Sequence, residues 1–123
     1  MAKTVMVVDD SASLRAVVRL ALEKEHFEVV EAVDGLDALE KLAAQQRVRL
    51  IICDVNMPRM DGLTFVKSMK AQAQHRFTPV VMLTTEGHPA LIAQGKAAGV
   101  KAWMVKPFQP DQLLGVVGTL VGP

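Results

Sequence analysis

Residues 50–54 are Leu50-Ile51-Ile52-Cys53-Asp54, four apolar residues in a row followed by a carboxylate. An apolar run without alternation is typical of a parallel strand that is covered by helices on both faces. The following segment, 54–62, contains Pro58 and Gly62, which indicates a loop. The stretch therefore predicts a buried parallel strand with an aspartate directly after it.

The same order, a short apolar strand and then an amphipathic segment, repeats on both sides of this stretch. Strands are predicted at residues 5–8, 27–32, 50–53, 80–83 and 100–105. Apolar residues at helical spacing follow each of them, with Ser11 or Ser13 as the cap of the first helix and Pro89 and Pro110 in the first turns of the last two. Five such units predict an α/β fold, a doubly wound five-stranded parallel sheet with helices on both faces.

Length and composition limit the class of protein. The 123 residues suffice for one domain, 1–123, and 50% apolar residues suffice for a core. The net charge is +1 with no basic stripe, so we expect no nucleic-acid partner. We expect no membrane segment, because no apolar run approaches ~20 residues, and no signal peptide. A single cysteine fits a cytoplasmic protein, which we expect to be a monomer.

Ligands of such a sheet bind beyond the carboxyl ends of its strands, so the residues that follow each strand are informative. The second strand ends in Glu31-Ala32-Val33, with no obvious chemistry. Each of the others is followed by a polar group that taken alone has an ordinary structural explanation, such as a cap or a turn. Together they form one chemically compatible set: Asp9 and Asp10, Asp54, Thr84 and Thr85, and Lys106.

Three carboxylates at one edge repel each other, by about 4 kcal/mol per pair at ~4 Å and an effective dielectric near 20. Lys106 supplies one compensating charge, and a divalent cation would supply the rest. Ligands that are all oxygen favour Mg²⁺ or Mn²⁺ over zinc. A metal, an ammonium, a hydroxyl and a nucleophilic carboxylate together predict a phosphoryl-transfer site.

Four segments resemble the receiver domains of bacterial two-component systems, and the stand-alone chemotaxis type most closely. They are Val7-Val8-Asp9-Asp10-Ser11, residues 53–62 (CDVNMPRMDG), Leu83-Thr84-Thr85, and Val105-Lys106-Pro107-Phe108. The resemblance covers the whole chain. It implies the strand order 2-1-3-4-5 of the flavodoxin-like folds.

The resemblance also implies a role for each site residue. Asp54 would accept the phosphoryl group. Asp10 would bind Mg²⁺ directly, Asp9 largely through water, and Asn56 through its backbone carbonyl. Lys106 would pair with a phosphoryl oxygen, and its peptide bond to Pro107 is typically cis in the family.

Two further positions belong to the implied switch. Thr84 would bind the attached phosphoryl group. Trp103, where the family commonly has Tyr or Phe, would then rotate inward. Asn56 and Glu86 match the fast-hydrolysing chemotaxis type and imply a short-lived signal.

The implied function is a phosphorylation-activated signalling switch, not an enzyme beyond its own phosphorylation and dephosphorylation. The donor would be a sensor histidine kinase, and the partner would bind the fourth helix, fifth strand and fifth helix. A flagellar-motor switch protein, a histidine phosphotransfer protein in a phosphorelay, a phosphate-sink role and another regulated enzyme all remain open at this point.

Two rival functions come from other classes. A haloacid-dehalogenase-type phosphatase is also Mg²⁺-dependent with an aspartyl nucleophile, but it places that nucleophile after the first strand in an Asp-x-Asp pattern. A flavodoxin-like electron carrier needs an anion-binding loop after the first strand. There Asp9 and Asp10 would repel a flavin phosphate.

Overall fold

The computed structural model describes residues 2–45, 47–85 and 88–122. Its five strands form one parallel sheet in the order β2-β1-β3-β4-β5, which confirms the predicted fold class and strand order. The strands are β1 Thr4–Val8, β2 Glu28–Ala32, β3 Leu50–Asp54, β4 Val80–Thr84 and β5 Ala102–Val105.

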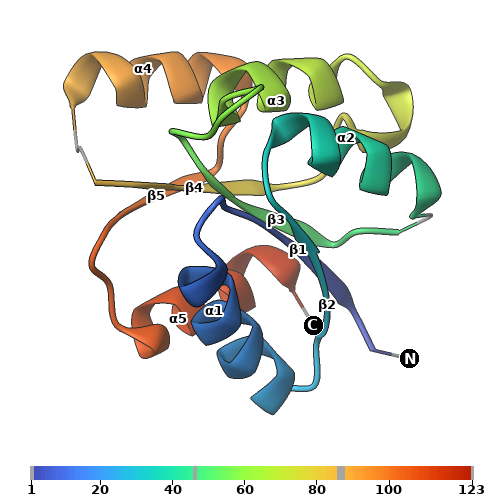
Figure 1. Cartoon of the computed structure of the whole chain (residues 1–123), viewed down its shortest axis with the longest axis vertical. Helices are drawn as coiled ribbons and strands as arrows, with labels where there is room; N and C mark the ends of the chain where they lie inside the picture. Colours follow the sequence, from blue (N-terminus) through green and yellow to red (C-terminus); the bar gives the residue numbers. More distant parts are fainter. Residues whose placement is uncertain (1, 46, 86–87, 123) are drawn as a thin grey trace.

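Helices cover both faces of this sheet (Figure 1). On one face lie α1 and α5, and on the other lie α2, α3 and α4. Their bounds are α1 Ala12–Lys24, α2 Gly35–Ala44, α3 Gly62–Lys70, α4 Pro89–Ala98 and α5 Pro110–Val121, with a short 3-10 helix η1 at Ala73–His75. Pro89 and Pro110 are the first residues of α4 and α5, in agreement with the sequence prediction.

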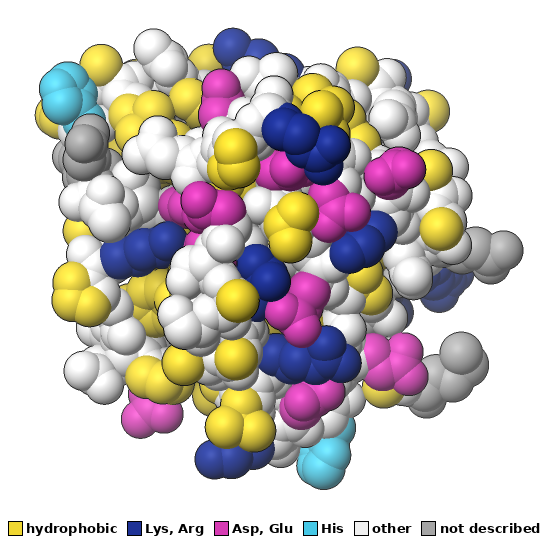
Figure 2. Space-filling view, viewed as in Figure 1, with side chains coloured by type: hydrophobic (Ala, Val, Ile, Leu, Met, Phe, Trp, Pro, Cys, Tyr) yellow, Lys and Arg dark blue, Asp and Glu magenta, His cyan; other side chains and the backbone are white. Residues whose placement is uncertain are grey.

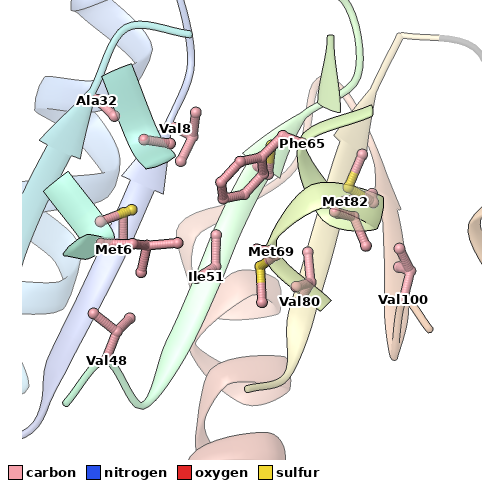
Figure 3. Packing of buried hydrophobic residues seen from close by; sticks show 14 of the residues in the cluster. Met6, Val8, Ala32, Val48, Ile51, Phe65, Met69, Val80, Met82 and Val100 are labelled. Atoms are coloured by element: carbon pink, nitrogen blue, oxygen red, sulfur yellow. The ribbon is translucent and has the colours of Figure 1, made fainter. Parts of the chain in front are cut away.

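The core is split by the sheet into two clusters, as a doubly wound fold requires. All residues of β3 and β4 are buried, so their continuous apolar runs are explained by cover on both faces. Figure 3 shows Phe65 and Met69 of α3 directed toward the sheet, close to Ile51 of β3. This packing holds α3 against β3.

Side-chain caps begin three of the helices near the carboxyl edge. Ser11, and not Ser13, caps α1 by accepting a hydrogen bond from Leu14 N–H at 3.2 Å. Asp34 and Asp61 cap α2 and α3 in the same way. Gly35 is the first residue of α2.

The first four strands differ from their predicted ranges by one residue at one end, and larger differences occur elsewhere. β5 begins at Ala102 and not at residue 100, because Val100 N–H donates to Gly95 O at 2.9 Å and completes the end of α4. Gly99 takes the left-handed conformation there, with φ 99°, as is common where a helix ends. The helix η1 was not predicted, and its three residues carry no periodic apolar pattern.

A separate property concerns membranes. In the described part of the chain, no helix has both the length and the apolar character that crossing a bilayer requires.

Candidate functional site

The sheet brings Asp9, which follows β1, Asp54, which ends β3, and Lys106, which follows β5, to one point at its carboxyl edge. Lys106 Nζ lies 2.9 Å from Asp9 Oδ2 and 3.3 Å from Asp54 Oδ1. Asp9 and Asp54 are buried, and the Lys106 side chain is 19% exposed. The predicted ammonium between the predicted carboxylates is thus present in the structure.

Asp9 is the most firmly held of the site carboxylates. Its Oδ1 accepts a hydrogen bond from Ser11 N–H at 2.8 Å, while its Oδ2 accepts the one from Lys106. Its backbone carbonyl accepts a hydrogen bond from Arg15 at 2.6 Å. Because the end of β1 is fixed by these three contacts, the orientation of the Asp9 side chain is also fixed.

Three carboxylates at this edge are placed to hold a cation. Asp9, Asp10 and Asp54 each offer an oxygen, and these oxygens lie within 4.8 Å of one another. Asp9 is fully buried, whereas Asp10 is exposed. Hard oxygen donors in this number fit Mg²⁺, which takes one or two carboxylates and keeps other positions for water and phosphate oxygens.

Burial and the neighbouring charges change the acid–base behaviour of the site. The pKa of Asp54 is raised, first because the carboxyl group is buried and then because Asp9 is close, although Lys106 acts in the opposite direction. Burial alone would lower the pKa of Lys106, but its contacts with Asp9 and Asp54 outweigh burial and raise it. Lys106 is therefore a permanent cation at neutral pH. The three carboxylates Asp9, Asp10 and Asp54 leave an excess of negative charge around this single ammonium.

The remaining predicted site residues lie around this cluster. Thr84 ends β4 and is buried, and Asn56 is exposed in the loop after β3. The Lys106–Pro107 peptide bond is cis, as the resemblance implied. Trp103 is partly buried beside α4 and packs against the core. Glu86 lies outside the described residues.

The sequence did not indicate how the site is connected to α1 and β2. Arg15 bonds both Asp9 O and, at 3.0 Å, Glu31 Oε1 of β2, and Arg19 donates to Glu31 Oε2 at 2.7 Å. The available signal was the i, i+4 spacing of Arg15 and Arg19, which places two cations on one helix face.

Charge is mixed on the face that Figure 2 shows. Dark blue Lys and Arg side chains lie interspersed with magenta Asp and Glu side chains across its middle, and no block of one sign dominates this face. Such a surface offers no continuous basic track for a nucleic-acid backbone.

Comparisons with known proteins agree with this geometry. A family model described as the response regulator receiver domain matches residues 5–118. The chemotaxis protein CheY1 of Helicobacter pylori is 37% identical over 118 residues, covering 95% of this chain and 95% of that protein. Protein PilG of Pseudomonas aeruginosa is 35% identical over 113 residues, covering 92% and 83%.

A solved structure supports the same assignment. The chemotaxis protein CheY4 of Vibrio cholerae matches with a TM-score of 0.93 and 44% identity, covering 98% of this chain and 99% of that one. On this evidence, together with the family match over residues 5–118, the chain belongs to the family of response-regulator receiver domains.

Proposed function

We propose that this protein is a phosphorylation-activated switch of a two-component system, which takes a phosphoryl group from a histidine kinase onto Asp54. The observation that carries the proposal is the position of Lys106 Nζ between Asp9 and Asp54, beside a third carboxylate. The family assignment favours this function over the phosphatase and the electron carrier. We further propose that residues 1–123 act as one monomeric receiver domain in the cytoplasm.

Mg²⁺ is the proposed metal, held by Asp9, Asp10, Asp54 and the backbone carbonyl of Asn56. Both carboxylate oxygens of Asp9 already accept hydrogen bonds, which favours an indirect contact through water. Asp10 is exposed and favours direct binding. When bound, the ion would neutralise the site carboxylates and the oxygens of the incoming phosphoryl group.

The transfer itself uses residues of this chain. A carboxylate oxygen of Asp54 attacks the phosphorus of a phosphohistidine, so a P–O bond forms while the P–N bond breaks. The imidazole nitrogen leaves with the bonding electron pair and takes a proton from solvent water. Lys106 pairs with a phosphoryl oxygen, and the hydroxyl of Thr84 donates a hydrogen bond to another once the group is attached. Hydrolysis of the aspartyl phosphate by water resets the switch, quickly if Asn56 and Glu86 act as the resemblance implies.

The output surface proposed is α4, β5 and α5, with Trp103 as the switch residue between the site and this surface. Relatives named chemotaxis proteins at high coverage support a role in chemotaxis, with a flagellar-motor switch protein as the first candidate partner. A phosphorelay through a histidine phosphotransfer protein, or a phosphate-sink role, is the second candidate.

Beryllium fluoride, a phosphoryl mimic, tests the proposal directly. With Mg²⁺, the wild type should form a bound fluoroberyllate species visible by ¹⁹F NMR, and the species should be absent without Mg²⁺. Asp54→Asn is the matched control, because it keeps the size of the side chain and removes the charged oxygen. A bound species of equal intensity in Asp54→Asn would refute Asp54 as the acceptor.

A further inference from the structure

The helix α4 carries an unusual contact on its inner side. Among its ten residues, all of them described, only Gly95 is buried. Two other α4 residues, Leu91 and Ala98, are partly buried and pack against the core together with Trp103. At Gly95, therefore, the backbone of α4 comes closest to the core residues that the helix covers.

The indole of Trp103 occupies the space that a side chain at position 95 would need. A Cβ atom placed on Gly95 would lie 2.8 Å from Trp103 Cε2 and 3.0 Å from Trp103 Nε1, and closer still to Cζ2. Real Cβ atoms almost never approach other atoms this closely, and a rigid indole offers no flexible end that could move away. The position of the indole thus depends on the absence of a side chain at Gly95.

A second, independent observation concerns the polar atom of the same ring. Trp103 Nε1 is buried and has no hydrogen-bond partner among the described residues. An unpaired buried donor costs free energy, so the indole is held under α4 by packing alone and against the preference of its N–H group. We therefore expect the indole to move out of this position if the packing around it changes.

From these two observations we propose that Gly95 is a positioning residue for Trp103: the gap at Gly95 holds the indole beneath α4 and so couples β5 to the α4 surface. The proposal rests on the proposed function, in which Trp103 is the switch residue. It adds that the size of residue 95 decides where this side chain lies, both at rest and after activation.

The first experiment measures the unphosphorylated protein, so it does not depend on the proposed function. Gly118→Ala is the matched control, because Gly118 also lies three residues before the end of its helix and a Cβ there meets nothing within 4 Å. Replacing glycine by alanine in a helix should raise the Tm of this control by roughly 4 °C. Gly95→Ala gains the same helix propensity, but overpacking should leave its Tm at least roughly 4 °C below that of the control.

A compensating variant and the fluorescence of Trp103 separate positioning from general damage. In a Trp103→Leu background, Gly95→Ala should raise the Tm measured by circular dichroism, as Gly118→Ala does. In the native background, Gly95→Ala should shift the emission of Trp103, the only tryptophan, to longer wavelength as the indole moves toward solvent. Equal Tm values and equal emission in Gly95→Ala and Gly118→Ala would overturn the proposal.

The second experiment adds beryllium fluoride and Mg²⁺ and follows the bound species by ¹⁹F NMR, which does not depend on Trp103. The emission of Trp103 should change on binding in the wild type and in Gly118→Ala, and this change should be lost in Gly95→Ala although the fluoroberyllate is bound. An equal emission change in all three proteins would overturn the coupling. No bound species in the wild type would instead count against the proposed function.

Discussion

The ammonium of Lys106 is the only positive group that the structure places between Asp9 and Asp54 among the described residues. Asp9 is completely buried, and a buried carboxylate that loses its partner costs far more than an exposed one. The proposed phosphorylation site is therefore also a point where the fold depends on charge balance. Its residues can be tested through stability as well as through activity.

Lys106→Met keeps the length of the side chain and removes its charge. We expect it to lower the free energy of unfolding by about 3 kcal/mol without Mg²⁺, the usual cost of breaking a buried ion pair on one side. Saturating Mg²⁺ should recover part of this loss, because the ion binds the same carboxylates in the folded state only. Urea unfolding with and without MgCl₂ measures both effects.

The exposed Lys101 provides the control for this variant. Lys101→Met should change stability by less than about 0.5 kcal/mol, as surface substitutions usually do, and should leave its Mg²⁺ dependence unchanged. If Lys106→Met and Lys101→Met had the same effect, the ammonium of Lys106 would not be balancing the charge of the site.

At the scale of elements, Glu31 joins β2 to α1. Hydrogen bonds from Arg19 lower the pKa of Glu31, burial acts against them, and Arg15 lowers it further. A carboxyl group whose pKa is lower in the folded state stabilises the protein above the unfolded value of 4.5, and this contribution is lost as the pH falls through the folded pKa. The contacts of Glu31 should therefore stabilise the fold at neutral pH, and this stabilisation should be lost in acid.

We expect Glu31→Gln to lower the stability by about 1 kcal/mol at pH 7, since each of its two partly solvated pairs is worth roughly 0.5 kcal/mol. The difference from the wild type should be constant above about pH 5 and should shrink below the unfolded pKa of 4.5. Thermal unfolding between pH 3 and pH 7 measures it. Glu28→Gln, an exposed change on the same strand, is the control and should change the stability at pH 7 by less than about 0.5 kcal/mol. A difference between Glu31→Gln and the wild type that persists undiminished at pH 3 would contradict the explanation.

α3 begins at Gly62, which lies against the end of β3, the strand that carries Asp54. A Cβ atom at Gly62 would lie 2.7 Å from Met82 Cε and 3.1 Å from the carbonyl carbon of Asp54, and closer to the carbonyl oxygen. Gly62 N–H also donates to Val55 O at 2.8 Å. The first residue of the helix thus fixes the backbone on both sides of the Asp54–Val55 peptide bond.

Gly62→Ala should force this backbone to move. We expect a loss of about 1–3 kcal/mol in stability, the usual cost of overpacking, and weaker binding of beryllium fluoride with Mg²⁺ because Asp54 is displaced. Gly115→Ala, where a Cβ meets nothing within 4 Å, is the control. If Gly62→Ala bound beryllium fluoride as tightly as the wild type does, the site would tolerate movement of α3.

Across the whole molecule, the sequence predicted what depends on strand order and missed what depends on side-chain contacts. Parallel strands end at the same edge, so Asp9, Asp54 and Lys106 could be placed together from their positions alone. The bonds of Glu31 to Arg15 and Arg19, and the contact of Gly95 with Trp103, join elements whose relative position appears only in the packed fold. The spacing of Arg15 and Arg19 places both on one helix face, but no local pattern identifies the partner of either contact, because each depends on the distance between a helix and the sheet.

The last prediction concerns the path from the site to the partner. Asp54 ends β3, whereas the proposed partner surface is formed by α4, β5 and α5. In the proposed function, phosphorylation therefore acts on a partner by changing the populations of two states of that surface. We expect beryllium fluoride with Mg²⁺ to tighten binding of the N-terminal peptide of a flagellar-switch protein from the same genome by at least roughly tenfold, within the usual range of such coupling. Fluorescence anisotropy of a labelled peptide measures this, and Asp54→Asn should show no tightening. Unchanged peptide affinity, with the fluoroberyllate shown to be bound, would rule out this motor partner and favour the relay or phosphate-sink role.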